Sequence, residues 1–237
     1  MCNLYGSTHE EGVRKYWRPA NVLAIPWEGG IIAPRKPGAF IRRSRNAEGY
    51  LIGPGRDLVV GRWGLIPWFA KNMDFRYSTN NARSEELENK PTFRTPWKRG
   101  QRCIIPADWF DEPNWESGKN VWWRFKRADG EPWALAGLWD TWRDNETGEM
   151  VDSYTMLTMH ANSHPLMGRM HKPDVDPATK RPLPFEQQDK RSVIPIEQGD
   201  VDQWLTGSMR DAKALLRLAP AEVFDAGPSA PTTRALL

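Results

Sequence analysis

The sequence predicts a single α+β domain, built on a mostly antiparallel, barrel-like β-sheet with a few short helices. Short runs rich in aromatic and β-branched residues recur along the chain and are broken by Gly and Pro, which is typical of strands joined by turns. Helical spacing of apolar residues is rare and lies mostly late in the chain. A length of 237 residues fits one large domain. We expect that domain to cover residues 1–227, followed by a flexible tail over residues 228–237.

Five runs of apolar and aromatic residues predict strands, in the order 61–68, 102–106, 120–127, 132–142 and 154–159. The third and fourth runs flank Ala128-Asp129-Gly130, and a short connection that contains Gly predicts a β-hairpin. Hairpins pair their strands in antiparallel fashion, so we expect antiparallel pairing to dominate the sheet.

Three segments have helical spacing, namely 82–89, 200–206 and 208–218. The second begins with acidic residues, which favour the first turn of a helix, and Ser208 is a candidate N-cap for the third. Residues 172–190 are rich in Pro, Asp, Lys and Gln without any period. We expect an exposed loop there.

Composition excludes several classes of protein. The chain has two cysteines, Cys2 and Cys103, and no signal-like apolar segment near its start, so neither a disulfide scaffold nor secretion is expected. The longest apolar runs, such as residues 133–139, are too short to span a bilayer. We therefore expect a cytoplasmic protein without a membrane partner.

Basic and aromatic residues are interleaved along the chain. The net charge is only +3, but Lys and Arg cluster at residues 42–45 and 98–102, and Arg62-Trp63 is one of several places where a tryptophan adjoins a cation. Such a mixture suits unpaired bases and their phosphates, because each stacked base contributes roughly 1–3 kcal/mol. The alternative is an aromatic-rich β core, which accounts for most of the thirteen tryptophans.

Cys2 follows directly on the initiator Met1, which can be trimmed before so small a residue. Trimming leaves an α-amine and a thiol on adjacent carbons, both partly available as nucleophiles near neutral pH. Such a pair can capture an aldehyde as an imine that closes to a thiazolidine, or the thiol alone can attack an acyl group. The alternative is that Cys2 is a small buried hydrophobe.

Two polar segments offer partners for such a terminus. Asn81 and Arg83 join a polar loop to a predicted helix, where an amide can hold a hydroxyl or amine and a guanidinium can bind a phosphate. Glu112 follows a buried strand, where burial would raise the pKa of a carboxyl that serves as general acid or base. A helix cap with surface charges and an ordinary turn carboxylate are the structural alternatives.

Three of the four histidines lie close together, at His160, His164 and His171. Pro165 interrupts any helix that would align the first two, and no metal-binding motif accompanies them, so we expect neither a metal nor a cofactor. One catalytic histidine is the better interpretation, because imidazole exchanges protons near neutral pH. Each of the three taken alone is better explained as a structural or surface histidine.

Five ordered motifs together resemble the SOS-response-associated peptidase (SRAP) family. They are Met1-Cys2, Arg62 to Pro67, Asn81 to Glu85, Arg102 to Glu112, and Ala161 to His171. The resemblance implies a covalent thiazolidine link between the terminal Cys and the aldehyde of abasic sites in single-stranded DNA, which protects the lesion during the DNA damage response. It also implies self-removal of the initiator Met. The same amine and Glu112 could support lyase activity by β-elimination, and we expect a monomer near the nucleoid.

The resemblance also implies roles for individual residues. Cys2 would be the nucleophile, Asn81 would bind the adduct, Glu112 would orient or deprotonate the amine, and His171 would transfer protons, with His164 as the second candidate. Contacts to DNA would come from two groups of side chains. They are Arg83, Trp63, Trp68 and Phe69, and, less firmly, Arg42, Arg43 and Arg169.

Two other classes of function stay open at this point. A class II glutamine amidotransferase also uses a terminal Cys for acyl transfer, but the chain lacks the Asn-Gly pair typical of its oxyanion segment. A non-catalytic module that binds single-stranded DNA through its basic and aromatic residues would leave Cys2 idle, and its binding would fall steeply with salt.

Overall fold

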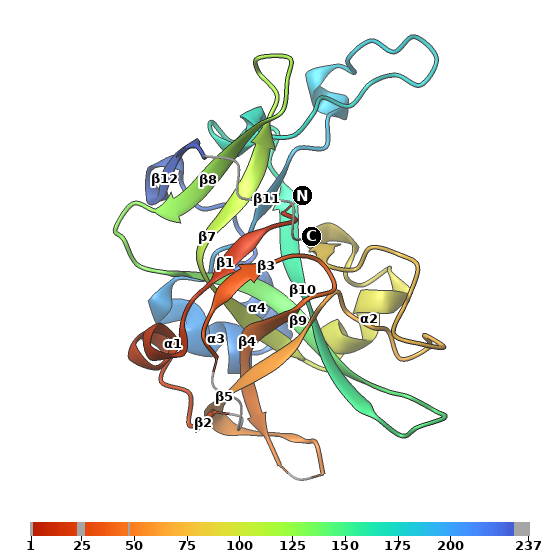
Figure 1. Ribbon diagram of the computed structural model, residues 1–237, viewed down its shortest axis with the longest axis vertical. Helices are drawn as coiled ribbons and strands as arrows, with labels where there is room; N and C mark the ends of the chain where they lie inside the picture. The colour runs from red at the N-terminus through yellow and green to blue at the C-terminus, as the bar shows by residue number, and fades with distance from the viewer. Residues whose placement is uncertain (1, 23–26, 47, 230–237) are drawn as a thin grey trace.

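The computed structural model describes residues 2–22, 27–46 and 48–229. Its β-sheet curls into a ring, because β10 (Met150–His160) pairs with β5 (Leu51–Trp63) on one side and with β9 (Trp133–Arg143) on the other. The circuit is completed by β4 (Pro37–Arg45) and β7 (Arg102–Asn114), and Figure 1 shows these strands crossing the middle of the molecule. The predicted α+β class is confirmed.

Shorter strands extend the sheet beyond the ring. They are β1 (Tyr5–Ser7), β2 (Asn21–Val22), β3 (Gly30–Ile32), β6 (Asn81–Arg83), β8 (Val121–Arg127), β11 (Arg191–Val193) and β12 (Phe224–Pro228). Most of the pairing is antiparallel, as predicted, but β10 runs parallel to β5 and β6, and β2 runs parallel to β5. The turn at Ala128-Asp129-Gly130 joins β8 to β9, but the predicted hairpin is wrong, because the two strands do not pair with each other. β8 pairs with the second half of β7 and with β12, whereas β9 pairs with the first half of β7 and with β10.

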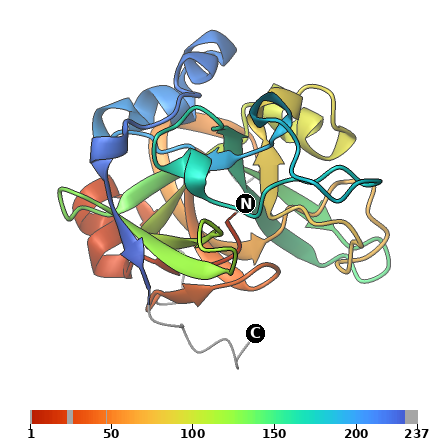
Figure 2. The ribbon, with the colours of Figure 1, turned by 90° about the horizontal axis from the view of Figure 1, so that it is seen from above.

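Helices lie around the outside of the sheet (Figure 2). The α-helices are α1 (Glu10–Trp17), α2 (Pro91–Lys98), α3 (Val201–Thr206) and α4 (Met209–Ala214); the 3-10 helices are η1 (Ser84–Glu86), η2 (Met167–Arg169), η3 (Phe185–Gln187), η4 (Gln198–Asp200) and η5 (Ala221–Val223). In the part of the chain that the structure describes, no helix has the length and apolar character needed to cross a membrane.

Two apolar cores lie on the two faces of the ring. In β7, Cys103 and Ile105 belong to the inner core, whereas Ile104 belongs to the outer core beneath the helices. Successive strand residues point to opposite faces, so a strand covered on both sides has an unbroken apolar sequence. Because both faces of β7 and β9 are covered, their sequences are almost continuously apolar, and this pattern allowed the two strands to be predicted. Cys2 lies in the inner core.

Two predicted elements have different bounds in the structure. The strand predicted over 61–68 stops at Trp63, because Gly64 adopts a φ of +139°, which turns the chain out of the sheet. The helix predicted over 82–89 is wrong at its start, since Ala82 is buried and pairs with Leu157 of β10. Tertiary pairing there overrides a helical pattern, and only the single turn η1 follows.

The later helices agree better with the prediction. Ser208 caps α4 through a capping box, its hydroxyl accepting from the Asp211 amide while the Asp211 carboxylate accepts from the Ser208 amide. α4 then ends at Ala214, short of the predicted residue 218. Pro228, which was predicted to begin the tail, is the last residue of β12, and residues 230–237 lie outside the described part of the chain.

Residues 172–190 form a projecting arm, visible at the upper right of Figure 1. An isolated bridge between Val175 and Pro182 joins its two sides, and the Asp176 carboxylate accepts from the backbone amides of Ala178 and Thr179 at its tip. The arm leaves the body directly after His171 and returns as β11. The predicted loop is therefore an ordered arm with η3 in its returning side.

Candidate active site

Cys2 lies where the first strand enters the core, and it is fully buried. The backbone amide of Asp111 donates to Leu4 O at 3.0 Å, which fixes this entry against β7. The Cys2 thiol donates to the same oxygen at 3.5 Å. Burial, and next the nearby Glu112 carboxylate, raise the pKa of the Cys2 thiol well above its usual value, so the sulfur keeps its proton at neutral pH.

Asn81 binds the backbone of Cys2 directly. β6 runs parallel to the central strand β10, which places the Asn81 side chain so that Nδ2 donates to Cys2 O at 2.6 Å. The neighbouring Asn80 Nδ2 donates to the same oxygen at 3.4 Å and to Asn3 Oδ1 at 3.1 Å. Among the described residues the buried Asn81 Oδ1 has no hydrogen-bond partner, so an acceptor is available next to Cys2.

Glu112 and His171 meet on the same side of the site. Glu112 is 1% exposed on β7, and its Oε2 lies 3.6 Å from His171 Nε2. Burial lowers the pKa of His171 below its usual 6.5, and the Glu112 carboxylate opposes this shift. The imidazole is therefore neutral at pH 7, and it can accept a proton as well as pass one on.

The backbone of His171 is held in an uncommon conformation. Its φ is +64°, in the left-handed region that non-glycine residues rarely adopt. Two hydrogen bonds secure it: the His171 amide donates to Pro113 O at 2.6 Å, and Lys190 Nζ donates to His171 O at 2.7 Å. Pro113, which directly follows Glu112, thus helps to fix the position of His171.

His164, the second candidate for the catalytic histidine, has a structural role instead. Its Nδ1 accepts from the backbone amides of Met167 at 2.9 Å and Leu166 at 3.2 Å. Its Nε2 must then carry the proton, and it donates to Ala219 O at 2.8 Å. With both ring nitrogens engaged by backbone, the buried ring ties η2 to the C-terminal segment.

The predicted aromatic contacts divide into buried and exposed residues. Trp63 is fully buried, and its Nε1 donates to Asn80 O at 2.8 Å, so it supports the site from within and is not available to stack on a base. Trp68 and Phe69 are 68% and 41% exposed and meet edge to face, with ring centroids 5.6 Å apart. Phe69 continues through Phe75 to Tyr77, which makes a ladder of four rings.

Arg42 does not reach the surface. It is buried, its guanidinium lies 4.3 Å from the ring centre of Trp139, and its Nη1 lies 3.3 Å from Asp152 Oδ1. Its position at the middle of β4 turns it into the sheet, so the predicted DNA contact is wrong for this residue.

Other predicted basic contacts lie nearer the surface. Arg43 donates from Nε to Gly53 O at 2.7 Å, and Arg169 forms a two-pronged pair with Glu116. Arg83 is 43% exposed and pairs with Asp189 and, at 3.7 Å, with Glu86. Contacts between these arginines and DNA stay predictions.

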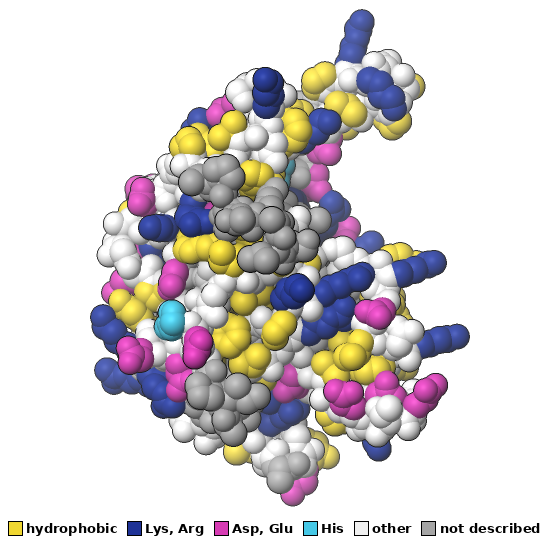
Figure 3. All heavy atoms as spheres, in the orientation of Figure 1, with side chains coloured by type: hydrophobic (Ala, Val, Ile, Leu, Met, Phe, Trp, Pro, Cys, Tyr) yellow, Lys and Arg dark blue, Asp and Glu magenta, His cyan; other side chains and the backbone are white. Residues whose placement is uncertain are grey.

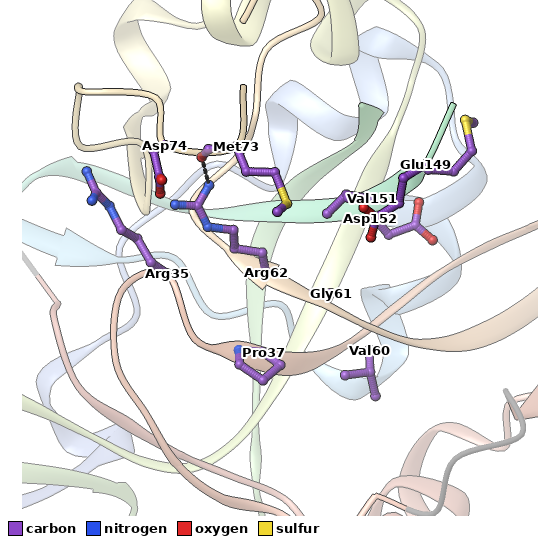
Figure 4. Close-up of a pocket in the computed structure, with 11 residues that line it drawn as sticks. Arg35, Pro37, Val60, Gly61, Arg62, Met73, Asp74, Glu149, Val151 and Asp152 are labelled. Atoms are coloured by element: carbon purple, nitrogen blue, oxygen red, sulfur yellow. Dashed lines mark hydrogen bonds between the residues drawn. The ribbon is translucent and has the colours of Figure 1, made fainter. Parts of the chain in front are cut away.

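Two depressions share Arg35 and Arg62, and Asn80 lines the smaller of them. The smaller, of about 190 Å³, is lined by Asn80, Trp63 and the segment from Phe75 to Thr79, together with Arg35 and Arg62. These two arginines also line the larger, of about 480 Å³, where Figure 4 shows Arg62 donating to Met73 O. Figure 3 shows a hollow between the arm and the body, with Lys and Arg side chains gathered beside it.

Sequence reasoning missed three residues that support the site. Asn80 shares the Cys2 carbonyl with Asn81, Lys190 holds the His171 carbonyl, and the buried Arg191 pairs with Glu85 at 2.7 Å. The Asn80-Asn81 doublet and the charge run at 189–191 were visible signals, but only the return of the arm brings that run to His171. In the described part of the chain no group of His, Cys, Asp and Glu is placed to hold a metal ion.

Comparison with curated proteins finds relatives that are named abasic site processing proteins. Abasic site processing protein YoqW of Bacillus subtilis is 39% identical over 124 residues, which are 51% of this chain and 54% of YoqW. Abasic site processing protein HMCES of Gallus gallus is 24% identical over 189 residues, which are 69% of this chain and 56% of that protein. The chain thus spans about half the length of the curated relatives it matches.

Comparison with solved structures and family models covers more of the chain. A crystal structure of a Bordetella bronchiseptica protein is 37% identical with a TM-score of 0.79, covering 97% of this chain and all of that one. A Bacteroides thetaiotaomicron structure, 21% identical with a TM-score of 0.68, shares the fold. The model of the SOS response associated peptidase (SRAP) family matches residues 31–228. The resemblance seen in the motifs is confirmed, and the chain belongs to the SRAP family.

Proposed function

We propose that this chain processes abasic sites in single-stranded DNA by capturing their aldehyde on Cys2. The observation that carries the proposal is that Cys2, held by Asn81, is buried close enough to Glu112 for that carboxylate to raise the pKa of its thiol, while Glu112 lies 3.6 Å from His171 Nε2. The names of the relatives YoqW and HMCES support abasic DNA as the substrate. An amine, a thiol, a carboxylate and a neutral imidazole together supply what capture of an aldehyde needs.

The sugar of an abasic site must first open, because its closed ring hides the aldehyde. His171 transfers a proton to the ring oxygen while the C1 hydroxyl gives up its proton, so a carbonyl forms as the ring bond breaks. A neutral imidazole suits this exchange, since it accepts one proton and passes on another. Glu112, 3.6 Å from His171 Nε2, stabilises the imidazolium that forms in between.

Capture then proceeds in two balanced steps. The Cys2 amine adds to the aldehyde carbon, and after proton transfers the carbonyl oxygen leaves as water, which gives an imine. The thiol sulfur next bonds to the imine carbon, the C=N double bond becomes single, and the thiol proton ends on nitrogen. Because the thiol is protonated and buried, we infer that the amine attacks first and the sulfur closes the ring.

Amine chemistry requires removal of Met1, because an amide nitrogen is not a nucleophile. We propose that the chain removes Met1 itself, with the Cys2 thiol attacking the preceding carbonyl and Glu112 or His171 carrying the proton to the departing amine. Hydrolysis of the resulting thioester frees the methionine. The peptidase in the family's name supports this activity.

The strand itself is proposed to cross the face next to Asn80. Arg83 would bind a phosphate, and Arg35 and Arg62 offer two more cations along the adjoining depressions. The exposed rings of Trp68 and Phe69 offer faces for unstacked bases. A duplex would bury its bases away from these rings, so single strands are the proposed substrate.

Denaturing electrophoresis with abasic single-stranded DNA tests the proposal. Wild-type protein is expected to give a shifted band that survives denaturation, with an intact mass that lacks Met1. Cys2→Ser, prepared with Met1 already removed and checked by intact mass, keeps the terminal amine but loses the sulfur, so it should give a product only when borohydride reduces the imine. Cys103→Ser, the matched control at the other buried cysteine, should crosslink like wild type.

The outcomes also separate the other classes of function. A strand-cleaved product without a stable band would identify lyase chemistry, in which the imine promotes β-elimination. Salt-sensitive binding without any covalent product would identify a binding module, and glutamine hydrolysis would identify acyl transfer. Retention of the band in Cys2→Ala would refute capture by Cys2.

A further inference from the structure

An ionic cluster lies where the base of the arm meets β6. Arg83 Nη2 pairs with Asp189 Oδ2, and the other oxygen of Asp189 lies 3.3 Å from Arg191 Nη1. Arg191 is anchored in turn, because its Nη2 lies 2.7 Å from Glu85 Oε2 and donates to Thr158 O at 3.0 Å. Arg83 is thus held by a carboxylate that the arm supplies.

Arg83 lies close to the reactive point. Residues two apart on a strand point to the same face, so Arg83 follows Asn81 on the side that faces Cys2, about 6.6 Å along β6. The Arg83 and Asp189 side chains are 43% and 36% exposed, and a ligand can therefore reach the pair from solvent. A phosphate next to a lesion held at Cys2 falls within reach of this guanidinium.

The arm presents Asp189 in a fixed orientation. The Asp189 amide donates to Asp174 Oδ2 at 2.9 Å, and the Asp174 amide donates to Gln188 Oε1 at 2.8 Å. Gln188 Nε2 donates back to Asp174 O at 3.1 Å. These bonds tie the two sides of the arm together directly before Asp189, so its carboxylate is aimed at Arg83 by ordered backbone.

We propose that Asp189 occupies the phosphate position on Arg83 and must be displaced before a DNA strand can bind there. This inference rests on the proposed function, since it assumes that Arg83 receives a DNA phosphate. A guanidinium binds carboxylate and phosphate through the same N–H groups, so the two anions compete directly. After the exchange Asp189 still pairs with Arg191, so displacing its carboxylate from Arg83 costs little free energy.

Such competition sets specificity. When an intact strand binds, it gains at Arg83 only the difference in binding free energy between its phosphate and the displaced carboxylate, so its affinity is lower. An abasic strand adds a covalent bond at Cys2, which the carboxylate does not oppose. Asp189 thereby disfavours retention on undamaged DNA.

Fluorescence anisotropy with an undamaged, labelled single strand tests the inference. Asp189→Asn should tighten binding about two- to fivefold, the fold-change expected for loss of an exposed competing ion pair. Glu186→Gln removes the same charge from the arm, and Glu186 has no ion pair with Arg83, so it should give less than half of that gain. In an Arg83→Ala background, Asp189→Asn should give no gain beyond that of Glu186→Gln.

Several results would overturn the inference. One is that Asp189→Asn binds the undamaged strand no more tightly than wild type does. If wild type still crosslinks abasic DNA, that result overturns this inference and leaves the proposed function intact. A gain that persists in full in the Arg83→Ala background would show a general charge effect. Wild type that neither binds nor crosslinks DNA would overturn both proposals. Asp189→Ser is measured in parallel, with thermal melting of each variant, so that folding does not decide the outcome.

Discussion

Individual side chains at the site depend on backbone contacts that no sequence motif contains. Asn81 is positioned by the pairing of β6 with β10, and His171 by Pro113 and Lys190. The motif resemblance named Cys2 and its candidate partners, and their roles stay predictions. It did not reveal that Trp63 and Arg42 are buried, because a strand's inner and outer positions cannot be told apart where both faces are covered.

Asn81 and its neighbour Asn80 offer a matched pair of substitutions. Asn81→Ala removes the 2.6 Å hydrogen bond to Cys2 O, and we expect crosslinking of abasic DNA to slow roughly fivefold or more, the equivalent of about 1 kcal/mol. Asn80→Ala removes a longer contact of 3.4 Å and should slow it less. Single-turnover rates on denaturing gels measure both, and equal rates in the two variants would contradict the assignment to Asn81.

The neutral, buried His171 makes stability depend on pH in a defined direction. Its folded pKa lies below 6.5, so the unfolded chain binds the proton more readily, and the free energy of unfolding falls as pH drops from 6.5 through the folded pKa. His171→Asn, a residue that tolerates positive φ, should lose less stability over that range. Urea denaturation at pH 7.5 and 5.0 compares the two proteins, and identical losses would refute this linkage.

At the scale of elements, prediction worked where pattern and environment agree. β7, β9 and α3 were located because their apolar residues are buried as the pattern implies. α1 and α2 were missed, although Glu10 and Glu11 favour the first turn of α1 and Pro91 suits the first position of α2. Eight-residue helices that contain a Gly or an internal Pro give a weak helical signal.

Ser208 is expected to contribute stability through its helix cap. Ser208→Ala removes the hydroxyl that accepts from the Asp211 amide at 3.2 Å, and the free energy of unfolding should fall by about 1 kcal/mol. Urea denaturation should show a lower midpoint with an unchanged slope. Ser117→Ala, in an exposed turn, is the control and should change stability little, and an equal effect there would argue against the cap.

Over the whole molecule, the closed ring and the projecting arm differ in how many partners hold them. β7 pairs with β1, β4, β8 and β9, so it cannot open without separating several strands. The arm is held mainly at its base. Its order could not be predicted from residues 172–190, because the ordering bonds join positions far apart in the segment, such as Asp174 and Gln188.

Hydrogen exchange measured by mass spectrometry should reproduce this difference. Peptides from β7 and β9 are expected to exchange slowest, near the rate set by global unfolding, and residues 176–181 at the tip of the arm should exchange fastest. Slow exchange at the tip in the free protein would contradict the contacts given above. Protection appearing there only with DNA bound would add the tip to the contact surface.

The uneven burial of the tryptophans has an optical consequence. Trp17, Trp63, Trp97, Trp133 and Trp204 are shielded inside the two cores, whereas the indole of Trp68 is open to solvent. A collisional quencher in water reaches an open indole far more readily than a shielded one, so its effect on the emission reports on residues such as Trp68. A base stacked on that ring would shield it in turn. If a strand binds as proposed, quenching of Trp68 would therefore report its occupancy without an attached dye.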